Sequence, residues 1–143
     1  MARISRHTYV ERLRAVPMFR ACSIRELEQV ARLADEIVVA AGEELVREGS
    51  RGAEFYVLAE GKAEVTRGSA TLAMLGPGDF FGELSLLEPG PRNATVTMVS
   101  PGRVLVLAQR QFFTLLADQP AVTTKLLVGM ARRLHEADAR PVR

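Results

Sequence analysis

Two charged side chains near the middle of the chain, Glu83 and Arg92, carry the clearest signal of binding chemistry. A phosphate bound by a protein needs backbone N–H groups that can approach closely and a guanidinium whose planar fork matches two oxygens. Gly82, Ser85 and Arg92 supply these parts within one short segment. A carboxylate beside an anion must face a different part of the ligand, so we expect Glu83 to accept a hydrogen bond from a sugar hydroxyl. Phosphate and sugar together predict a nucleotide site.

The same segment resembles a known sequence motif. FGELSLL at 81–87, followed by PRNATV at 91–96, is similar to the phosphate-binding cassette of the cyclic nucleotide-binding domain family. The motif is specific because it requires Phe, Gly, Glu, Arg, Ala and Thr in a fixed order. The resemblance extends over roughly residues 16–134. It implies a β jelly roll, or double-stranded β-helix, with helices before and after it.

The resemblance also implies a receptor module that binds cAMP, with cGMP as the less favoured ligand and with no metal. It assigns the phosphate and the ribose to eight residues: Gly82, Glu83, Leu84, Ser85, Arg92, Asn93, Ala94 and Thr95. The backbone N–H groups of Gly82, Leu84 and Ser85 would donate to the phosphate. Arg92 would pair with the phosphate, and Glu83 would bind the ribose 2′-hydroxyl.

Five further residues are expected to wall or cap the purine: Val65, Met74, Phe81, Arg132 and Arg133. An arginine can stack on an aromatic base, but a solvated helix face is an equal alternative for Arg132 and Arg133. The three apolar residues are most simply part of the core or of the pocket wall.

Asn93 departs from the family pattern. The residue after the arginine is often alanine in cAMP-preferring domains, and threonine or serine in domains that favour cGMP. An asparagine could donate to the ligand or stabilise a turn, so it leaves the nucleotide selectivity open. For Thr95, packing in a strand is favoured over a contact with the phosphate.

A sheet and helices must position these residues. Ser23 and Glu26 form a capping-box pattern at the start of a helix that is expected to run to about Asp35. A weaker helix is expected before Pro17, which ends or redirects it. From Glu36 onward, short apolar runs alternate with glycine turns, which predicts the strands of a sandwich or barrel.

We therefore predict one domain over residues 1–143, with a leading helical segment at about 8–35, the jelly roll and its cassette at about 36–108, and C-terminal helices at about 109–137. The cassette is expected to contain a short helical turn at 83–87. The final helix begins at Pro120 and carries an apolar stripe. It is expected to act as a lid that moves when ligand binds.

The composition argues against several other functions. The net charge is only +2 and the arginines lie among acids, so binding of nucleic acid is not expected. No apolar run approaches the roughly 20 residues of a membrane helix, and no secretory signal is visible, so membrane insertion is not expected and a cytoplasmic location follows by default. The single cysteine, Cys22, and both histidines, His7 and His135, lie outside the expected barrel. Metal or nucleophilic catalysis is therefore not expected, and the chain is predicted not to be an enzyme.

The expected mechanism is binding without chemistry. Ligand affinity would bias the position of the final helix, and the output would pass through a partner protein or an effector domain outside this chain. The alternative from a different class is a degenerate interaction or structural module that keeps the fold and no longer binds nucleotide. Loss of Glu83 or Arg92 would mark that alternative, and both residues are present.

Overall fold

The computed structural model describes residues 5–138 of the chain and divides them into two compact units. Residues 33–112 form the β unit, while residues 5–32 and 113–138 form the helical unit. Within the described residues, none of the helices is both long enough and apolar enough to cross a membrane.

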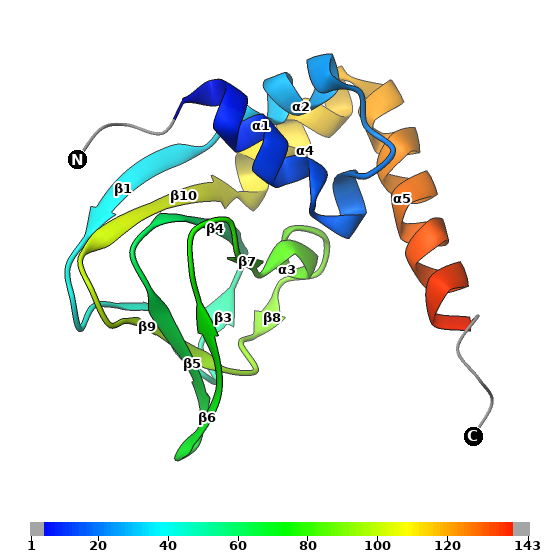
Figure 1. Ribbon diagram of the computed structural model, residues 1–143. Coiled ribbons are helices and arrows are strands. Elements are labelled where there is room, and N and C mark those ends of the chain that lie inside the picture. The colour runs from blue at the N-terminus through cyan, green and yellow to red at the C-terminus, as the bar shows by residue number, and fades with distance from the viewer. Residues whose placement is uncertain (1–4, 139–143) are drawn as a thin grey trace. The chain divides into compact units, whose positions relative to one another are not determined.

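Antiparallel pairing organises the β unit into two four-stranded sheets and one two-stranded ribbon (Figure 1). The first sheet has the order β1 (Asp35–Val39), β10 (Gly102–Ala108), β4 (Glu54–Glu60) and β7 (Phe80–Phe81). The second sheet has the order β2 (Glu44–Val46), β9 (Thr95–Met98), β5 (Ala63–Arg67) and β6 (Ala70–Leu75). The ribbon pairs β3 (Arg51–Gly52) with β8 (Gly90–Pro91). This mainly antiparallel β fold, with helices before and after it, is the fold class expected from the sequence.

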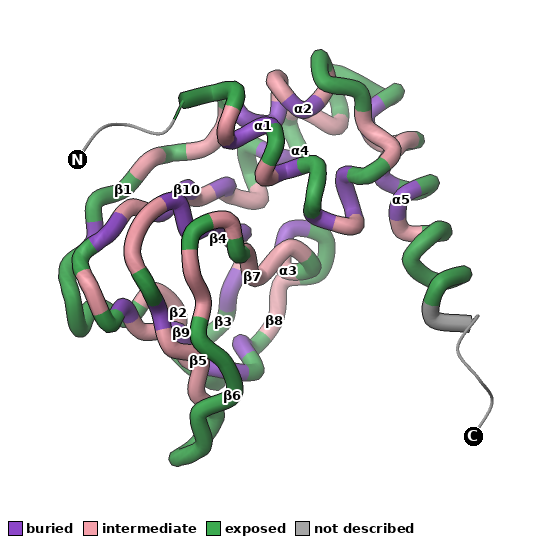
Figure 2. The backbone as a smooth tube through the Cα atoms, in the orientation of Figure 1, coloured by how far each residue is buried: buried purple, intermediate pink, exposed green. Residues whose placement is uncertain are grey.

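The core of the β unit takes apolar side chains from both large sheets. Along β9, buried and half-buried residues alternate, because successive side chains of a strand point to opposite faces. Burial recurs along β4 and β10, where Figure 2 shows it in purple. The central cluster consists of Val39, Leu58, Ala63, Val96, Met98 and Val104. Burial of these side chains holds the two sheets together.

Helices precede and follow the strands. The helical unit contains α1 (Arg6–Arg14), the 3-10 helix η1 (Pro17–Phe19), α2 (Ile24–Ala31) and α5 (Pro120–Asp138). Helix α4 (Gln109–Asp118) crosses the boundary between the units, and α3 (Glu83–Leu87) belongs to the β unit.

Helix α2 begins with the capping box expected from the sequence. The Ser23 hydroxyl accepts from the N–H of Glu26 at 3.2 Å, and the Glu26 carboxylate accepts from the N–H of Ser23 at 2.7 Å. The hydrogen bond from the Ser23 backbone lowers the pKa of Glu26, since it stabilises the charged form. The expected end at about Asp35 was wrong, because the helix ends at Ala31. Asp35 instead pairs with Val106 in the β1–β10 ladder, which requires an extended backbone.

Helix α5 approaches η1 closely at a glycine. A Cβ on Gly129 would lie 2.7 Å from the carbonyl oxygen of Met18 and 3.1 Å from that of Pro17. A real side chain does not tolerate a contact of 2.7 Å with backbone, so this packing requires glycine.

The expected apolar stripe of α5 is buried only in its first half. Val122 and Leu126 are 1% and 4% exposed, and Met130 is half-buried. Leu134, near the end of the helix, is 65% exposed. The second half of the stripe therefore leaves apolar surface uncovered within the helical unit.

Replacing Gly129 by alanine is expected to destabilise the protein, although alanine raises helix propensity by about 1 kcal/mol. The new Cβ would overlap backbone oxygens that cannot rotate away, and overpacking of this kind costs about 1–3 kcal/mol. The measurement is urea unfolding followed by far-UV circular dichroism. Leu127→Ala is the control in the same helix, because Leu127 is 67% exposed. Unfolding of Gly129→Ala at the same or a higher urea concentration than the parent would contradict this account.

Candidate functional site

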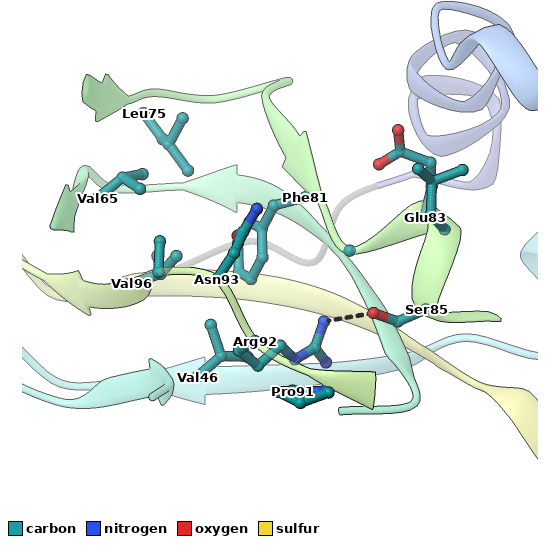
Figure 3. Close-up of a pocket in the computed structure, with 13 residues that line it drawn as sticks. Val46, Val65, Leu75, Phe81, Glu83, Ser85, Pro91, Arg92, Asn93 and Val96 are labelled. Carbon is teal, nitrogen blue, oxygen red and sulfur yellow. Dashed lines mark hydrogen bonds between the residues drawn. The ribbon is translucent and has the colours of Figure 1, made fainter. Parts of the chain in front are cut away.

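A cavity of about 330 Å³ lies in the β unit, beside α3 and β8 (Figure 3). Its walls come from both sides of the cassette and from the second sheet. The lining residues are Val46, Val65, Leu75, Phe81, Gly82, Glu83, Leu84, Ser85, Pro91, Arg92, Asn93, Ala94 and Val96. The cavity therefore brings together most of the residues expected to bind phosphate and ribose.

Gly82 allows α3 to begin close to Arg92. Its φ is +83°, in the left-handed region, and a Cβ there would lie 2.7 Å from Nη1 of Arg92 and 2.8 Å from the carbonyl oxygen of Glu54. Helix α3 then spans Glu83–Leu87, where the sequence predicts a helical turn. Within this turn the N–H of Ser85 donates to the carbonyl of Gly82 at 3.0 Å. One of the three N–H groups expected at the phosphate is therefore already hydrogen-bonded.

The guanidinium of Arg92 is buried and held from several sides. Arg92 is 9% exposed, its Nη1 donates to the Ser85 hydroxyl at 3.1 Å, and its Nη2 donates to the carbonyl of Glu54 at 2.9 Å. The Glu54 carboxylate lies 3.5 Å from the same Nη2, and the Tyr56 ring centroid lies 5.9 Å from Cζ. Burial and the charge of Glu54 raise the pKa of Tyr56, while the charge of Arg92 lowers it. These contacts compensate a charge that would otherwise be costly to bury.

The backbone of Arg92, directly after the β3–β8 ribbon, is held by the two residues that precede β3. Its N–H donates to the carbonyl of Ser50, and its carbonyl accepts from the N–H of Gly49, each at 2.8 Å. In the same ribbon Gly52 pairs with Gly90. A Cβ on Gly52 would lie 1.8 Å from Nε of Arg92, whereas a Cβ on Gly90 would meet nothing within 4 Å. The guanidinium therefore occupies the space that any side chain at position 52 would need.

A row of valines forms the apolar wall of the cavity. Val96 on β9 is in register with Val46 on β2 and with Val65 on β5. Directly paired residues of neighbouring strands point to the same face, so their side chains form a continuous surface. Phe81, which also lines the cavity, stacks on Tyr56 at a centroid distance of 4.8 Å and an angle of 10°. The cavity thus has a charged end at Arg92 and a long apolar side.

Met74 is 53% exposed and does not line the cavity, whereas the next residue, Leu75, does. Successive residues of a strand face opposite ways, so Leu75 faces the cavity at the place where the sequence analysis expects Met74. Four lining residues were not predicted from the sequence: Val46, Leu75, Pro91 and Val96. Alternation along the strands was the available signal for the valines, but it does not say which face meets the ligand.

Glu83 and Asn93 both line the cavity. Figure 3 shows the Glu83 carboxylate turned away from the Arg92 guanidinium. The backbone of Asn93 is held by Arg67, whose Nε donates to its carbonyl at 2.8 Å. Asn93 thus adds an uncharged amide to a lining that is otherwise charged at Arg92 and Glu83 and mainly apolar elsewhere.

Three other expected residues are not part of the cavity lining. The Thr95 hydroxyl accepts from the N–H of Glu48 at 2.9 Å, which agrees with the strand-packing alternative. Arg132 and Arg133 are exposed on α5 in the helical unit, so the cavity is formed without them. In the described part of the chain, no group of three or more His, Cys, Asp or Glu side chains could hold a metal ion.

Comparison with known proteins agrees with this geometry. A sequence profile described as cyclic nucleotide-binding domain matches residues 36–119. The cyclic AMP receptor protein of Thermus thermophilus is 31% identical over 131 residues, which cover 88% of this chain and 61% of that protein. A cAMP-dependent protein kinase regulatory subunit of Mycosarcoma maydis is 34% identical over 120 residues, covering 78% of this chain and 23% of that protein.

A solved structure agrees with the fold over almost the whole chain. The N-terminal domain of a transcriptional regulator from Streptomyces coelicolor A3(2) matches with a TM-score of 0.83 at 36% identity, and covers 92% of this chain and 99% of that one. In contrast, the chain spans less than two thirds of the length of the two curated relatives. The similarity therefore concerns one module of those longer proteins.

The close contact between Gly52 and Arg92 generates a prediction that needs no ligand. Gly52→Ala is expected to displace the guanidinium and to lower the free energy of unfolding by about 1–3 kcal/mol, since the new Cβ overlaps Nε. Gly90→Ala, at the paired position of the same ribbon, should change neither the position of the guanidinium nor the free energy of unfolding, because its Cβ meets open space. The measurements are urea unfolding and the ¹⁵Nε resonance of Arg92. An unmoved resonance and unchanged stability in Gly52→Ala would disprove the close contact.

Proposed function

The chain belongs to the cyclic nucleotide-binding domain family, and we propose that its cavity binds cAMP, with cGMP as the less favoured ligand. The observation that carries this proposal is the buried Arg92 guanidinium, which lines the same cavity as the Ser85 hydroxyl and the Glu83 carboxylate. An arginine fork suits two phosphate oxygens, and a carboxylate suits a ribose hydroxyl. The cavity volume of about 330 Å³ lies within the range of small-molecule sites.

The proposed arrangement uses the two ends of the cavity differently. The cyclic phosphate pairs with Arg92 and accepts from Ser85 and from the N–H groups of Gly82 and Leu84. Glu83 accepts from the ribose 2′-hydroxyl. The small Ala94 leaves room beside the phosphate, and Thr95 supports it from the strand. The phosphate thereby orients the nucleotide.

The purine then lies along the apolar wall. Val65 and Phe81 supply part of that wall, and the Asn93 amide is available to the base or the ribose. Arg132 and Arg133 on α5 are proposed as the purine cap, since a guanidinium can stack on a base. Met74 is no longer favoured for this role, because its neighbour Leu75 faces the cavity.

The names of the relatives support cAMP over cGMP, and they describe receptors and regulatory subunits. We therefore propose binding without catalysis, with α5 transmitting the signal to a partner protein or to an effector domain. The relatives differ in what they regulate, so neither nucleic acid nor a kinase is proposed as the partner. A degenerate module is not favoured, because Arg92 and Glu83 are both in place around one cavity.

The direct test is calorimetric titration of the chain with cAMP and cGMP, together with the variant Arg92→Leu. Removing one partner of a buried charge pair costs about 3–5 kcal/mol, so affinity should fall about 10²- to 10³-fold or more. Arg47→Leu is the control within the β unit, because the Arg47 side chain is 71% exposed. Binding by Arg92→Leu within a few-fold of the parent would exclude Arg92 as the phosphate ligand.

The ribose assignment is tested by Glu83→Ala titrated with cAMP and with 2′-deoxy-cAMP. One charge-assisted hydrogen bond contributes about 1.5–3 kcal/mol, so cAMP affinity should fall less than in Arg92→Leu. The variant should also lose the preference for ribose over deoxyribose. Glu88→Ala, an exposed carboxylate directly after α3, serves as the control. If Glu83→Ala keeps the preference of the parent, Glu83 has another role.

The lid role of α5 is tested by hydrogen exchange with and without cAMP. Leu127 and Leu134 are 67% and 65% exposed, so the helix carries apolar surface that closure could cover. Amides of α5 are expected to exchange more slowly with cAMP bound, while amides of α1 serve as the internal reference. If the amides of α5 exchange at the same rate with and without saturating cAMP, the helix is not a lid.

A further inference from the structure

Glu54 is a carboxylate beside the proposed phosphate site that neither the phosphate nor the ribose assignment uses. Its Oε1 lies 3.5 Å from Nη2 of Arg92, and its side chain is 43% exposed. Glu54 does not line the nucleotide cavity. It lines a separate cavity of about 380 Å³, together with Asp35 and Arg110 among others. The guanidinium of Arg92 therefore has the nucleotide cavity on one side and a carboxylate on another.

The backbone keeps Glu54 next to Arg92. The Glu54 carbonyl accepts from Nη2 at 2.9 Å, while the contact of Nη1 is with the Ser85 hydroxyl at 3.1 Å. A ligand oxygen that enters the cavity can compete for Nη1 without disturbing the carbonyl contact of Nη2. The backbone of Glu54 then stays beside Arg92 while the ligand is bound, which keeps its carboxylate within reach of Nη2.

The balance of charge at this site favours an anion with a single charge. Among the lining residues, Arg92 is the one cation and Glu83 the one carboxylate. Glu54 adds a second negative charge 3.5 Å from Nη2 of Arg92, and Asp35 lines the same separate cavity as Glu54. Arg110 lines that cavity as well, and burial raises the pKa of Tyr56 above its ordinary value, which favours the neutral phenol. One guanidinium can compensate one phosphate charge but not two.

We infer that Glu54 is a specificity-determining residue that selects singly charged cyclic phosphates against doubly charged phosphomonoesters. The inference rests on the proposed function of the cavity. A cyclic phosphodiester carries one negative charge, whereas a phosphomonoester carries nearly two at neutral pH, because its second pKa is about 6. Repulsion by Glu54 grows with the charge of the ligand, so Glu54 weakens the binding of 5′-AMP more than the binding of cAMP. Partial exposure of Glu54 screens this repulsion and keeps it modest.

The experiment measures the affinities of cAMP and 5′-AMP at pH 7.5 and low salt for the parent chain and for Glu54→Gln. Glutamine removes the charge and keeps a side-chain acceptor for the N–H of Ala53, which lies 3.5 Å from Oε1 of Glu54. With effective screening at this partly exposed site, cAMP should bind about threefold more tightly and 5′-AMP about tenfold more tightly. The ratio of the Kd for 5′-AMP to the Kd for cAMP should therefore be about threefold smaller in Glu54→Gln than in the parent, because the two ligands differ by one charge.

Two controls separate charge from shape and from general electrostatics. Glu60→Gln removes the same charge at the other end of β4, about 20 Å away, and should change neither affinity. The methyl ester of 5′-AMP is open-chain like 5′-AMP but carries one charge like cAMP. It should respond to Glu54→Gln as cAMP does. Added salt should shrink the difference between the parent and Glu54→Gln, which a purely structural role of Glu54 would not produce.

The possible outcomes are distinguishable. If the parent chain binds neither cAMP nor 5′-AMP, the proposed function is wrong, and the proposed selection by charge is wrong as well. Binding of cAMP by the parent, with equal changes for both nucleotides in Glu54→Gln, overturns the selection by charge and leaves the proposed function intact. Weaker binding of both nucleotides by Glu54→Gln would also contradict the selection by charge, because Glu54 would then act by positioning Arg92.

Discussion

The guanidinium of Arg92 carries a positive charge, yet it is almost fully buried, so the fold must provide it with partners and with space. The partners come from β4 and α3, which contribute the Glu54 carbonyl and the Ser85 hydroxyl. The space comes from two glycines, Gly52 and Gly82, whose missing side chains would overlap the arginine. This one group determines the arrangement of three neighbouring elements: the start of α3, the β3–β8 ribbon and the first residues of β4.

Features with local causes could be predicted from the sequence. The helical turn at 83–87 follows from its helix formers, and the capping box follows from Ser23 and Glu26. Strand register was not accessible in this way, because it depends on partners elsewhere in the chain. The pairing of β5 with β6 shifts between Val65 and Thr66, so alternation in the sequence alone could not decide which side chain of β6 faces the cavity.

The contact between Glu54 and Arg92 was missed for a related reason. The two residues are separated by 38 positions, and nothing near Glu54 in the sequence marks it as part of a binding site. The extended backbone at Asp35 is likewise fixed by a strand from the far end of the β unit. Local patterns identify which chemistry is present, whereas long-range pairing decides which charges act on it.

The valine row has a consequence for how the chain folds. Val46, Val65 and Val96 lie on three strands that are distant in sequence, so the wall exists only after non-local pairing is complete. Because a partly paired chain lacks this surface, a nucleotide that uses it binds the finished β unit and not its precursors. At a free concentration 100 times its Kd, such a ligand stabilises the folded state by about 2.7 kcal/mol. Occupancy of the cavity would therefore report that folding is complete as well as that the nucleotide is present.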